Sequence, residues 1–158
     1  MTLREARPRR RDQGGAAAVE FALVLPLLVL LLFGIISYGV MLSFRQSLSQ
    51  AAAEGARAAA VTFVAADKQD EAVAAVDSAL DSFDLTCAAP DLLKGGSDVG
   101  ACTVTAPGAC TPAAAAGVEC VTVTLTFDYR DHPIVPSFPG VGYLMPRELS
   151  YSAQARVS

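Results

Sequence analysis

From Phe21 to Phe44 the chain carries no charged residue, and this run restricts the possible folds more than any other feature. Sixteen of its 24 residues are Leu, Ile, Val or Phe. As a helix rising about 1.5 Å per residue it would be about 36 Å long, more than the roughly 30 Å of a bilayer's hydrocarbon core. A buried core helix would show a polar face, and the apolar region of a cleavable secretory signal has only about 7–15 residues. The run predicts one transmembrane helix in a lipid bilayer.

Charge is divided unevenly on the two sides of this run. Residues 1–13 hold five arginines against two carboxylates, a net charge of +3, and the remainder of the chain has a net charge of −7. Positive segments stay in the cytoplasm, so we expect a cytoplasmic N-terminus, a single pass through the inner membrane and an extracytoplasmic C-terminal domain. Tyr38 and Phe44 suit the outer interface, and Arg45 is the one cation on that flank. The acidic remainder repels phosphate, so no nucleic-acid partner is expected.

A glutamate stands at the start of the apolar run. The simplest interpretation is that the Glu20 carboxylate lies hydrated among the lipid headgroups, because an unpaired charge inside the hydrocarbon is costly. Gly15 lies five positions earlier, and Phe21 follows Glu20 directly. This order of glycine, four small or apolar residues, glutamate, phenylalanine and a leucine run resembles a class of prepilin cleavage site.

The wider segment resembles the TadE-like family of pseudopilins (TadE and TadG) from tight-adherence, or type IVc, pilus systems. The resemblance rests on the blocks Ala16–Ala22 (AAAVEFA), Leu23–Leu28 (LVLPLL) and Phe33–Gly39 (FGIISYG), and on Gln50–Arg57 (QAAAEGAR) after the apolar run. It covers residues 13–60, about a third of the chain. Beyond that segment only the plan is similar: a helix, cysteines and then strands.

The resemblance implies processing and assembly. A membrane prepilin peptidase would cut after Gly15, with a shifted site after Gly14 as the variant, and Ala16 would become the new N-terminus. Ala16 and Glu20 stand one helical turn apart, so an amine–carboxylate pair is available within the chain, whereas in pilins the partner is a neighbouring subunit's amine. Other pilin or pseudopilin subunits and the pilus assembly platform are the implied partners. The alternative is an uncleaved chain.

The rest of the sequence predicts a small α+β domain. Residues 45–65 contain strong helix formers, with Gly55 the weak point, so the membrane helix should continue outward as a stalk. Apolar side chains recur at helical spacing from Asp67 to Phe83. Residues 117–129 and 149–157 alternate apolar and polar side chains as half-buried antiparallel strands do, and residues 101–106 offer a third strand. We therefore expect a cytoplasmic leader at 1–15, a membrane helix and stalk at 16–65, and a domain at 66–158.

Four cysteines, all in the outer domain, predict two disulfides, because their number is even and they lie beyond an oxidising membrane face. Their spacing contains no CxxC pair, which disfavours zinc. Three pairings are possible. If residues 101–106 and 117–129 form a hairpin, one disulfide joins Cys102 to Cys120 and the other joins Cys87 to Cys110.

Nothing in the sequence predicts catalysis. His132 is the single histidine, no nucleophile elbow or phosphate-binding glycine loop is present, and Gly95-Gly96 indicates a turn. The apolar, proline-rich residues 132–146 are expected to pack across a sheet edge, or else to contact a partner or the membrane. We expect no enzyme activity, cofactor or metal. The sequence favours a minor pilin or pseudopilin-like structural subunit that assembles a pilus or a related secretion apparatus and so serves cell adhesion; the alternative is an unprocessed, membrane-anchored envelope protein with a binding domain.

Overall fold

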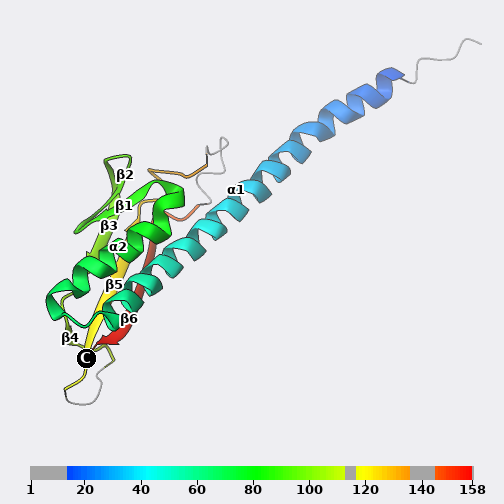
Figure 1. The fold of residues 1–158 in the computed structure, drawn as a ribbon. Helices are drawn as coiled ribbons and strands as arrows, with labels where there is room; N and C mark the ends of the chain where they lie inside the picture. The colour runs from blue at the N-terminus through cyan, green and yellow to red at the C-terminus, as the bar shows by residue number, and fades with distance from the viewer. Residues whose placement is uncertain (1–13, 113–116, 136–144, 158) are drawn as a thin grey trace, which may run out of the picture. The chain divides into compact units, whose positions relative to one another are not determined.

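The computed structural model describes residues 14–112, 117–135 and 145–157, in two compact units, Met1–Ile36 and Ser37–Ser158 (Figure 1). The described part of the first unit consists of helix α1 (Gly14–Val61), which continues into the second unit. Leu and Ala dominate its sequence, and both are strong helix formers. The predicted continuation of the apolar run into one long helix is confirmed, although Pro26 lies inside it and cannot donate a backbone hydrogen bond.

In the second unit, the part of α1 after Ser37 supplies one wall of the core. Its buried side chains recur every three or four residues, so they form one face of the helix. They are large near the start and small near the end: Met41, Phe44, Leu48, Ala51, Ala52, Ala56 and Ala59. The segment expected to be a stalk is therefore part of the packed domain, and the core begins well before the expected boundary at residue 65.

The second helix lies where the sequence predicted it. Helix α2 (Lys68–Leu80) is preceded by the 3-10 turn η1 (Ala65–Asp67) and followed by η2 (Asp81–Phe83). Ala72, Val76 and Leu80 are fully buried, and the carboxylates of the first turn, Asp70 and Glu71, are exposed. Figure 1 shows α2 lying with the C-terminal part of α1 against the sheet.

The sheet is antiparallel throughout and has the order β1-β2-β3-β5-β6, with the two-residue β4 pairing with the beginning of β5. Its longest ladder joins β5 to β6 along nine residue pairs, from Glu119 opposite Val157 to Phe127 opposite Leu149. The predicted strands at 101–106, 117–129 and 149–157 are confirmed. The strands are β1 (Leu85–Ala88), β2 (Asp91–Lys94), β3 (Ser97–Val104), β4 (Gly108–Ala109), β5 (Glu119–Phe127) and β6 (Leu149–Val157).

Strands β1, β2 and β4 were not predicted, because four or two residues are too few for an alternating pattern to be recognised. The turn predicted at Gly95-Gly96 joins β2 to β3, with Lys94 opposite Ser97. Both glycines have positive φ, +55° and +83°. These values match the two-residue hairpin turns that favour glycine.

The core lies between this sheet and the two helices. Val121, Val123, Leu125 and Phe127 point from β5 into it and are fully buried. Phe44 packs at its centre, with ring centroids 4.7 Å from Phe127 and 5.0 Å from Phe83, both edge to face. Such geometry is favourable between aromatic rings. The placement of Phe44 at the membrane interface was wrong: its side chain is 0% exposed, because it belongs to the buried face of α1.

Candidate functional site

The N-terminal part of α1 exposes apolar side chains on all sides. Leu23, Leu27 and Leu31 are at least 60% exposed, and no part of the most apolar 18-residue stretch is buried. Of the helices in the described part of the chain, α1 is the one long and apolar enough to cross a membrane. Exposing these apolar side chains to water would cost free energy, whereas exposing them to the hydrocarbon of a bilayer would not. The structure thus indicates a single-pass membrane protein.

All four residues of the candidate processing and assembly site lie in the first two turns of α1. Ala16, Glu20 and Phe21 are exposed, and nothing lies within 4 Å of a side chain built at Gly15. One continuous helix places Ala16 and Glu20 a turn apart, the arrangement needed for an amine–carboxylate pair. The arginine-rich residues 1–13 lie outside the described residues.

Further along α1, the block Glu54-Gly55-Ala56-Arg57 has a different role on each face. Arg57 Nε donates to Glu54 Oε2 over 3.1 Å on the exposed side. Gly55 faces inward, where a Cβ would lie 2.7 Å from Val76 Cγ2 and 3.1 Å from the Ala72 carbonyl oxygen. The missing side chain lets α1 and α2 approach closely. Gly55, a weak point for the isolated helix, is thus a contact point in the domain.

The four cysteines form two disulfides, but not in the expected pairing. Cys87 bonds Cys102, and Cys110 bonds Cys120. The expected Cys102–Cys120 bond is wrong because the register places Cys102 opposite Leu125 in β5. Cys102 N–H instead donates to the Pro90 carbonyl, beside the turn that joins β1 to β2. This contact brings its Cα within 5.5 Å of that of Cys87.

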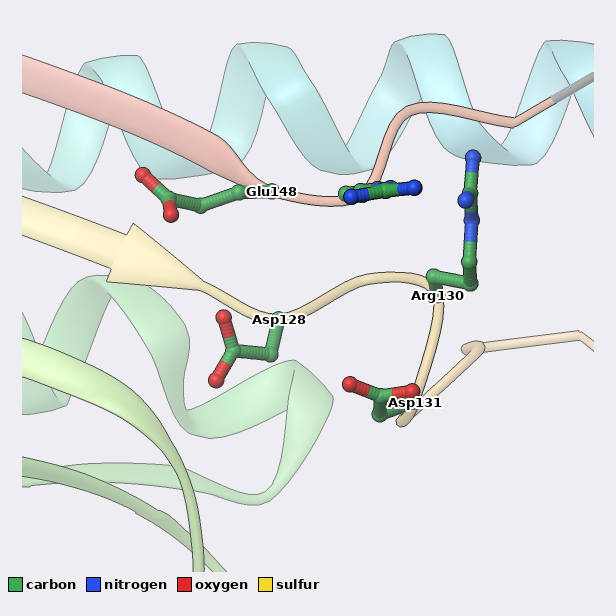
Figure 2. A pocket seen from close by; sticks show the side chains of 5 residues that line it. Asp128, Arg130, Asp131 and Glu148 are labelled. Atoms are coloured by element: carbon green, nitrogen blue, oxygen red, sulfur yellow. The ribbon is translucent and has the colours of Figure 1, made fainter.

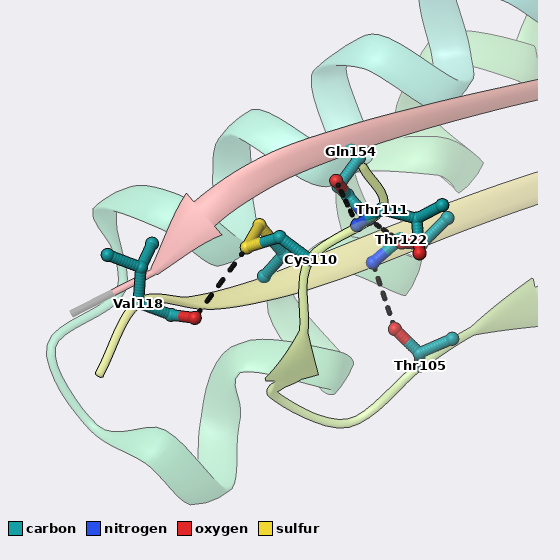
Figure 3. The surroundings of a disulfide bond; sticks show 7 residues. Thr105, Cys110, Thr111, Val118, Thr122 and Gln154 are labelled. Carbon is teal, nitrogen blue, oxygen red and sulfur yellow. Dashed lines mark hydrogen bonds between the residues drawn. A yellow bond between two sulfur atoms is a disulfide. The ribbon is translucent and has the colours of Figure 1, made fainter. Parts of the chain in front are cut away.

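The second disulfide fastens the segment after β4 to the first residues of β5. The two Cα atoms are 5.0 Å apart. Figure 3 shows how the polar groups around it are satisfied: Thr111 N–H donates to Gln154 Oε1, and Thr122 N–H donates to Thr105 Oγ1. Because disulfides persist in oxidising compartments, this pair of bonds fits a domain outside the cytoplasm.

A charged pocket that the sequence did not predict lies where β5 ends and β6 begins. Its volume is about 390 Å³, and Figure 2 shows its side chains spread around an open space. Arg130 Nη2 donates to the Met145 carbonyl over 2.9 Å instead of pairing with a carboxylate. Among the described residues no three potential ligands are grouped as a metal ion requires. The pocket is lined by Asp128, Arg130, Asp131, Arg147 and Glu148.

Two further residues at this end of the sheet bear on the sequence predictions. His132 is exposed, and its backbone N–H donates to the Asp128 carbonyl. Tyr129 is only 3% exposed, and its burial raises the pKa of its phenol above the usual value of 10.0. Of the proline-rich segment 132–146, residues 136–144 lie outside the described residues, while Ile134 packs against the core and Met145 is buried.

One cation of α1 contacts the sheet. Arg45 Nε donates to the Tyr151 hydroxyl over 2.6 Å, and its guanidinium carbon lies 6.0 Å from the centre of the same ring. The contact joins α1 to β6 across 106 positions of sequence. The sequence indicated Arg45 only as a positive charge at the outer end of the apolar run.

These features define an α+β membrane protein with one candidate span and a disulfide-bonded domain. In a comparison with known families, the model of the family described as TadE-like protein matches residues 15–57. The predicted resemblance to the TadE-like family is confirmed over that segment, and it indicates a protein related to tight-adherence pili. No curated protein and no solved structure matches the chain.

Proposed function

We propose that this chain is a pseudopilin-like structural subunit, without catalytic activity, that takes part in assembling a tight-adherence pilus or a related secretion apparatus. The observation that carries the proposal is the TadE-like match over residues 15–57. That segment includes the lipid-type surface of α1, Glu20 at its start and the close contact at Gly55.

The proposed topology is supported by the charge distribution and by the redox chemistry of the cysteines. The five arginines of residues 1–13 would stay in the cytoplasm, and the two disulfides would form outside it. Both observations support a domain on the extracytoplasmic face of the inner membrane. The loop after α1 adds a feature suited to assembly: Phe63 is 99% exposed, with Val61 and Val64 beside it at 64% and 56%. Monomeric soluble proteins rarely expose contiguous apolar patches of large area.

Processing is the first test. A prepilin peptidase would cut between Gly15 and Ala16, in the first turn of α1, and the end of a helix opens at little cost in free energy. Mass spectrometry of the chain extracted from its native membrane should then show a mature N-terminus at Ala16. Gly15→Val should block this cleavage, while Gly14→Val, the matched control, should leave it intact. A chain that keeps Met1 in the wild type would favour the unprocessed membrane anchor.

The assembly role has its own test. Deleting the gene should abolish or shorten surface pili, and complementation with the wild-type chain should restore them. Complementation with Glu20→Gln should restore membrane insertion but not pilus assembly, because the amide cannot attract a neighbouring amine as a carboxylate does. Normal pili in the deletion strain would exclude the proposed role.

A further inference from the structure

The loop after α1 presents an apolar side chain close to a carboxylate. Phe63 is 99% exposed, and the neighbouring Val64 is 56% exposed. In the turn η1 that follows, Asp67 N–H donates to the Val64 carbonyl, which keeps the exposed Asp67 near these apolar residues. Lys68 Nζ donates to the Thr62 carbonyl on the other side of Phe63. These hydrogen bonds hold the loop at both ends while its largest side chain stays in water.

A hollow between α1 and β6 combines apolar surface with a positive charge. Its volume is about 330 Å³, and Gln46 and Ser49 form part of its lining. Leu42, which is 39% exposed, and the half-buried Tyr151 supply apolar surface, and Arg45 supplies the charge. An apolar cavity of about 150 Å³ is enough to hold benzene. The hollow therefore has room for a phenyl ring.

Neither the loop nor the hollow has its charge paired within the described part of the chain. The one ion pair found there joins Arg57 to Glu54. Arg45 is exposed and uses its Nε on the neutral Tyr151 hydroxyl, so the N–H groups on its two terminal nitrogens remain available. Asp67 stands at the N-cap of α2, but its side chain makes no capping hydrogen bond. A ring near a carboxylate thus complements apolar surface beside a guanidinium.

The loop and the hollow cannot meet within one chain. Arg45 and Val61 lie on the same helix, sixteen residues or about 24 Å apart. A contact between two different surfaces of identical chains is heterologous, and it continues from copy to copy unless the rotation closes a ring. If the α1 helices of two copies run in the same direction, the surfaces meet when one copy is displaced by about 24 Å along the helix. Such a displacement is expected between successive subunits of a filament.

We propose that the loop at residues 61–67 of one copy docks in the hollow between α1 and β6 of a second copy. The Phe63 ring packs against Leu42 and Tyr151 and so leaves water. The Asp67 carboxylate pairs with the free N–H groups of Arg45, a charge-assisted contact. This inference rests on the proposed function as a structural subunit, and it names the surfaces through which successive subunits join.

Photo-cross-linking from position 63 of the full-length chain tests the contact. The chain with p-benzoylphenylalanine in place of Phe63 is produced in cells that carry its assembly system and is then irradiated. A covalent dimer should form, and peptide mapping should place the new bond at residues 42–49 or at Tyr151 of the second copy. The same photo-reactive residue in place of Thr86, which is exposed on β1, is the control and should give no dimer.

Exchanging the two charges tests the ion pair. Asp67→Arg should lower the yield of dimer about tenfold, because it places a second cation opposite Arg45. Arg45→Asp should lower it similarly, and the two exchanges together should restore it. Asp81→Arg, after the other end of α2, changes the net charge by the same amount and should leave the yield unchanged. A double exchange that gives as little dimer as the single ones would refute the pairing.

A cross-link to a different protein, or to another surface of the second copy, would overturn the proposal. Non-reducing peptide mapping of both disulfides verifies that each variant has folded. If Arg45→Asp fails to fold, Arg45→Gln replaces it, and an unchanged yield of dimer in that variant would refute the pairing. A mapped dimer in a strain whose pili do not need the chain would remove only the pilus role. Absence of a dimer where pili do need the chain would remove only this contact.

Discussion

Gly55 shows how a residue that weakens an isolated helix can stabilise a folded domain. Alanine there would improve helix propensity by about 1 kcal/mol. Its Cβ, however, would lie 2.7 Å from Val76 Cγ2 and 3.1 Å from the Ala72 carbonyl, and the carbonyl can move only with the backbone of α2. Overpacking of this kind typically costs about 1–3 kcal/mol.

We therefore expect Gly55→Ala to lower the free energy of unfolding by up to about 2 kcal/mol, the overpacking cost less the gain in propensity. Chemical denaturation of the detergent-solubilised chain, followed by circular dichroism, measures the change. Gly39→Ala in the same helix is the control, because nothing lies within 4 Å of the added Cβ. A more stable Gly55→Ala protein would show that the two helices do not meet closely at this residue.

The buried Tyr129 makes the stability of the domain depend on pH in the alkaline range. In the unfolded chain its phenol loses its proton near pH 10, whereas burial raises the pKa of the folded group. Between these two pKa values the unfolded state binds fewer protons than the folded state, so the stability falls as the pH rises above about 10. The contribution of the protonated Tyr129 phenol to the free energy of unfolding is fully present below about pH 10.

Tyr129→Phe should remove this part of the pH dependence. Denaturation midpoints measured from about pH 9 to pH 11 should fall less steeply for the variant than for the wild type. Tyr151→Phe, which removes a phenol that is only half-buried, is the comparison. Equal slopes in Tyr129→Phe and the wild type would contradict the prediction.

At the scale of elements, the end of α1 depends on a lysine from the next helix. Lys68 is 2% exposed, and its Nζ donates to the Thr62 carbonyl over 2.5 Å and to the Ala59 carbonyl over 3.4 Å. The last carbonyls of a helix have no partner within the helix, and a cation there also interacts favourably with the helix dipole. Lys68 therefore fixes the connection between α1 and α2.

Replacing Lys68 by methionine keeps most of the volume and removes the donor. We expect the free energy of unfolding to fall by about 1–3 kcal/mol, the cost of leaving buried acceptors without a partner. Lys94→Met in β2, which changes the chain's other lysine, should change the stability by no more than about 0.5 kcal/mol. Denaturation curves of the two variants give the comparison. An equal loss of stability in Lys68→Met and Lys94→Met would mean that the hydrogen bonds of Lys68 at the end of α1 do not stabilise the domain.

For the whole molecule, the division of α1 between two units gives a prediction about fragments. A fragment that begins at Ser37 keeps every core residue of α1, from Met41 to Ala59, and loses the lipid-type surface. A fragment that begins at residue 66 lacks Phe44 and Leu48, which are fully buried in the complete chain. Domains are stable by only about 5–15 kcal/mol, which is less than the loss of a whole helical wall would cost.

The fragment 37–158, produced in an oxidising compartment, should be soluble without detergent and unfold cooperatively. The fragment 66–158 should not unfold cooperatively. Calorimetry of the two fragments, with non-reducing peptide mapping to verify the Cys87–Cys102 and Cys110–Cys120 bonds, provides the test. A stable 66–158 fragment would show that the α1 segment is a stalk after all.

The elements that could be predicted from residue order are those whose pattern is long enough to be recognised. Helix α2 and the long strands β5 and β6 each repeat one spacing over nine or more residues, and the apolar run continues without a charge over 24 residues, so local chemistry was sufficient. The TadE-like segment, which the family model matches at residues 15–57, could likewise be recognised from its residues. Beyond these elements, prediction required contacts between distant parts of the chain.

Only the tertiary structure decided which faces of these elements meet. The role of Gly55 depends on α2, the pairing of Cys102 depends on the register between β3 and β5, and the contact of Arg45 depends on a tyrosine 106 residues away. Phe44 ends the apolar run and looks like a lipid-facing residue, yet its ring is buried between Phe83 and Phe127. Hydrophobicity predicts that a side chain leaves water, but it does not distinguish lipid from a protein core, because both are apolar.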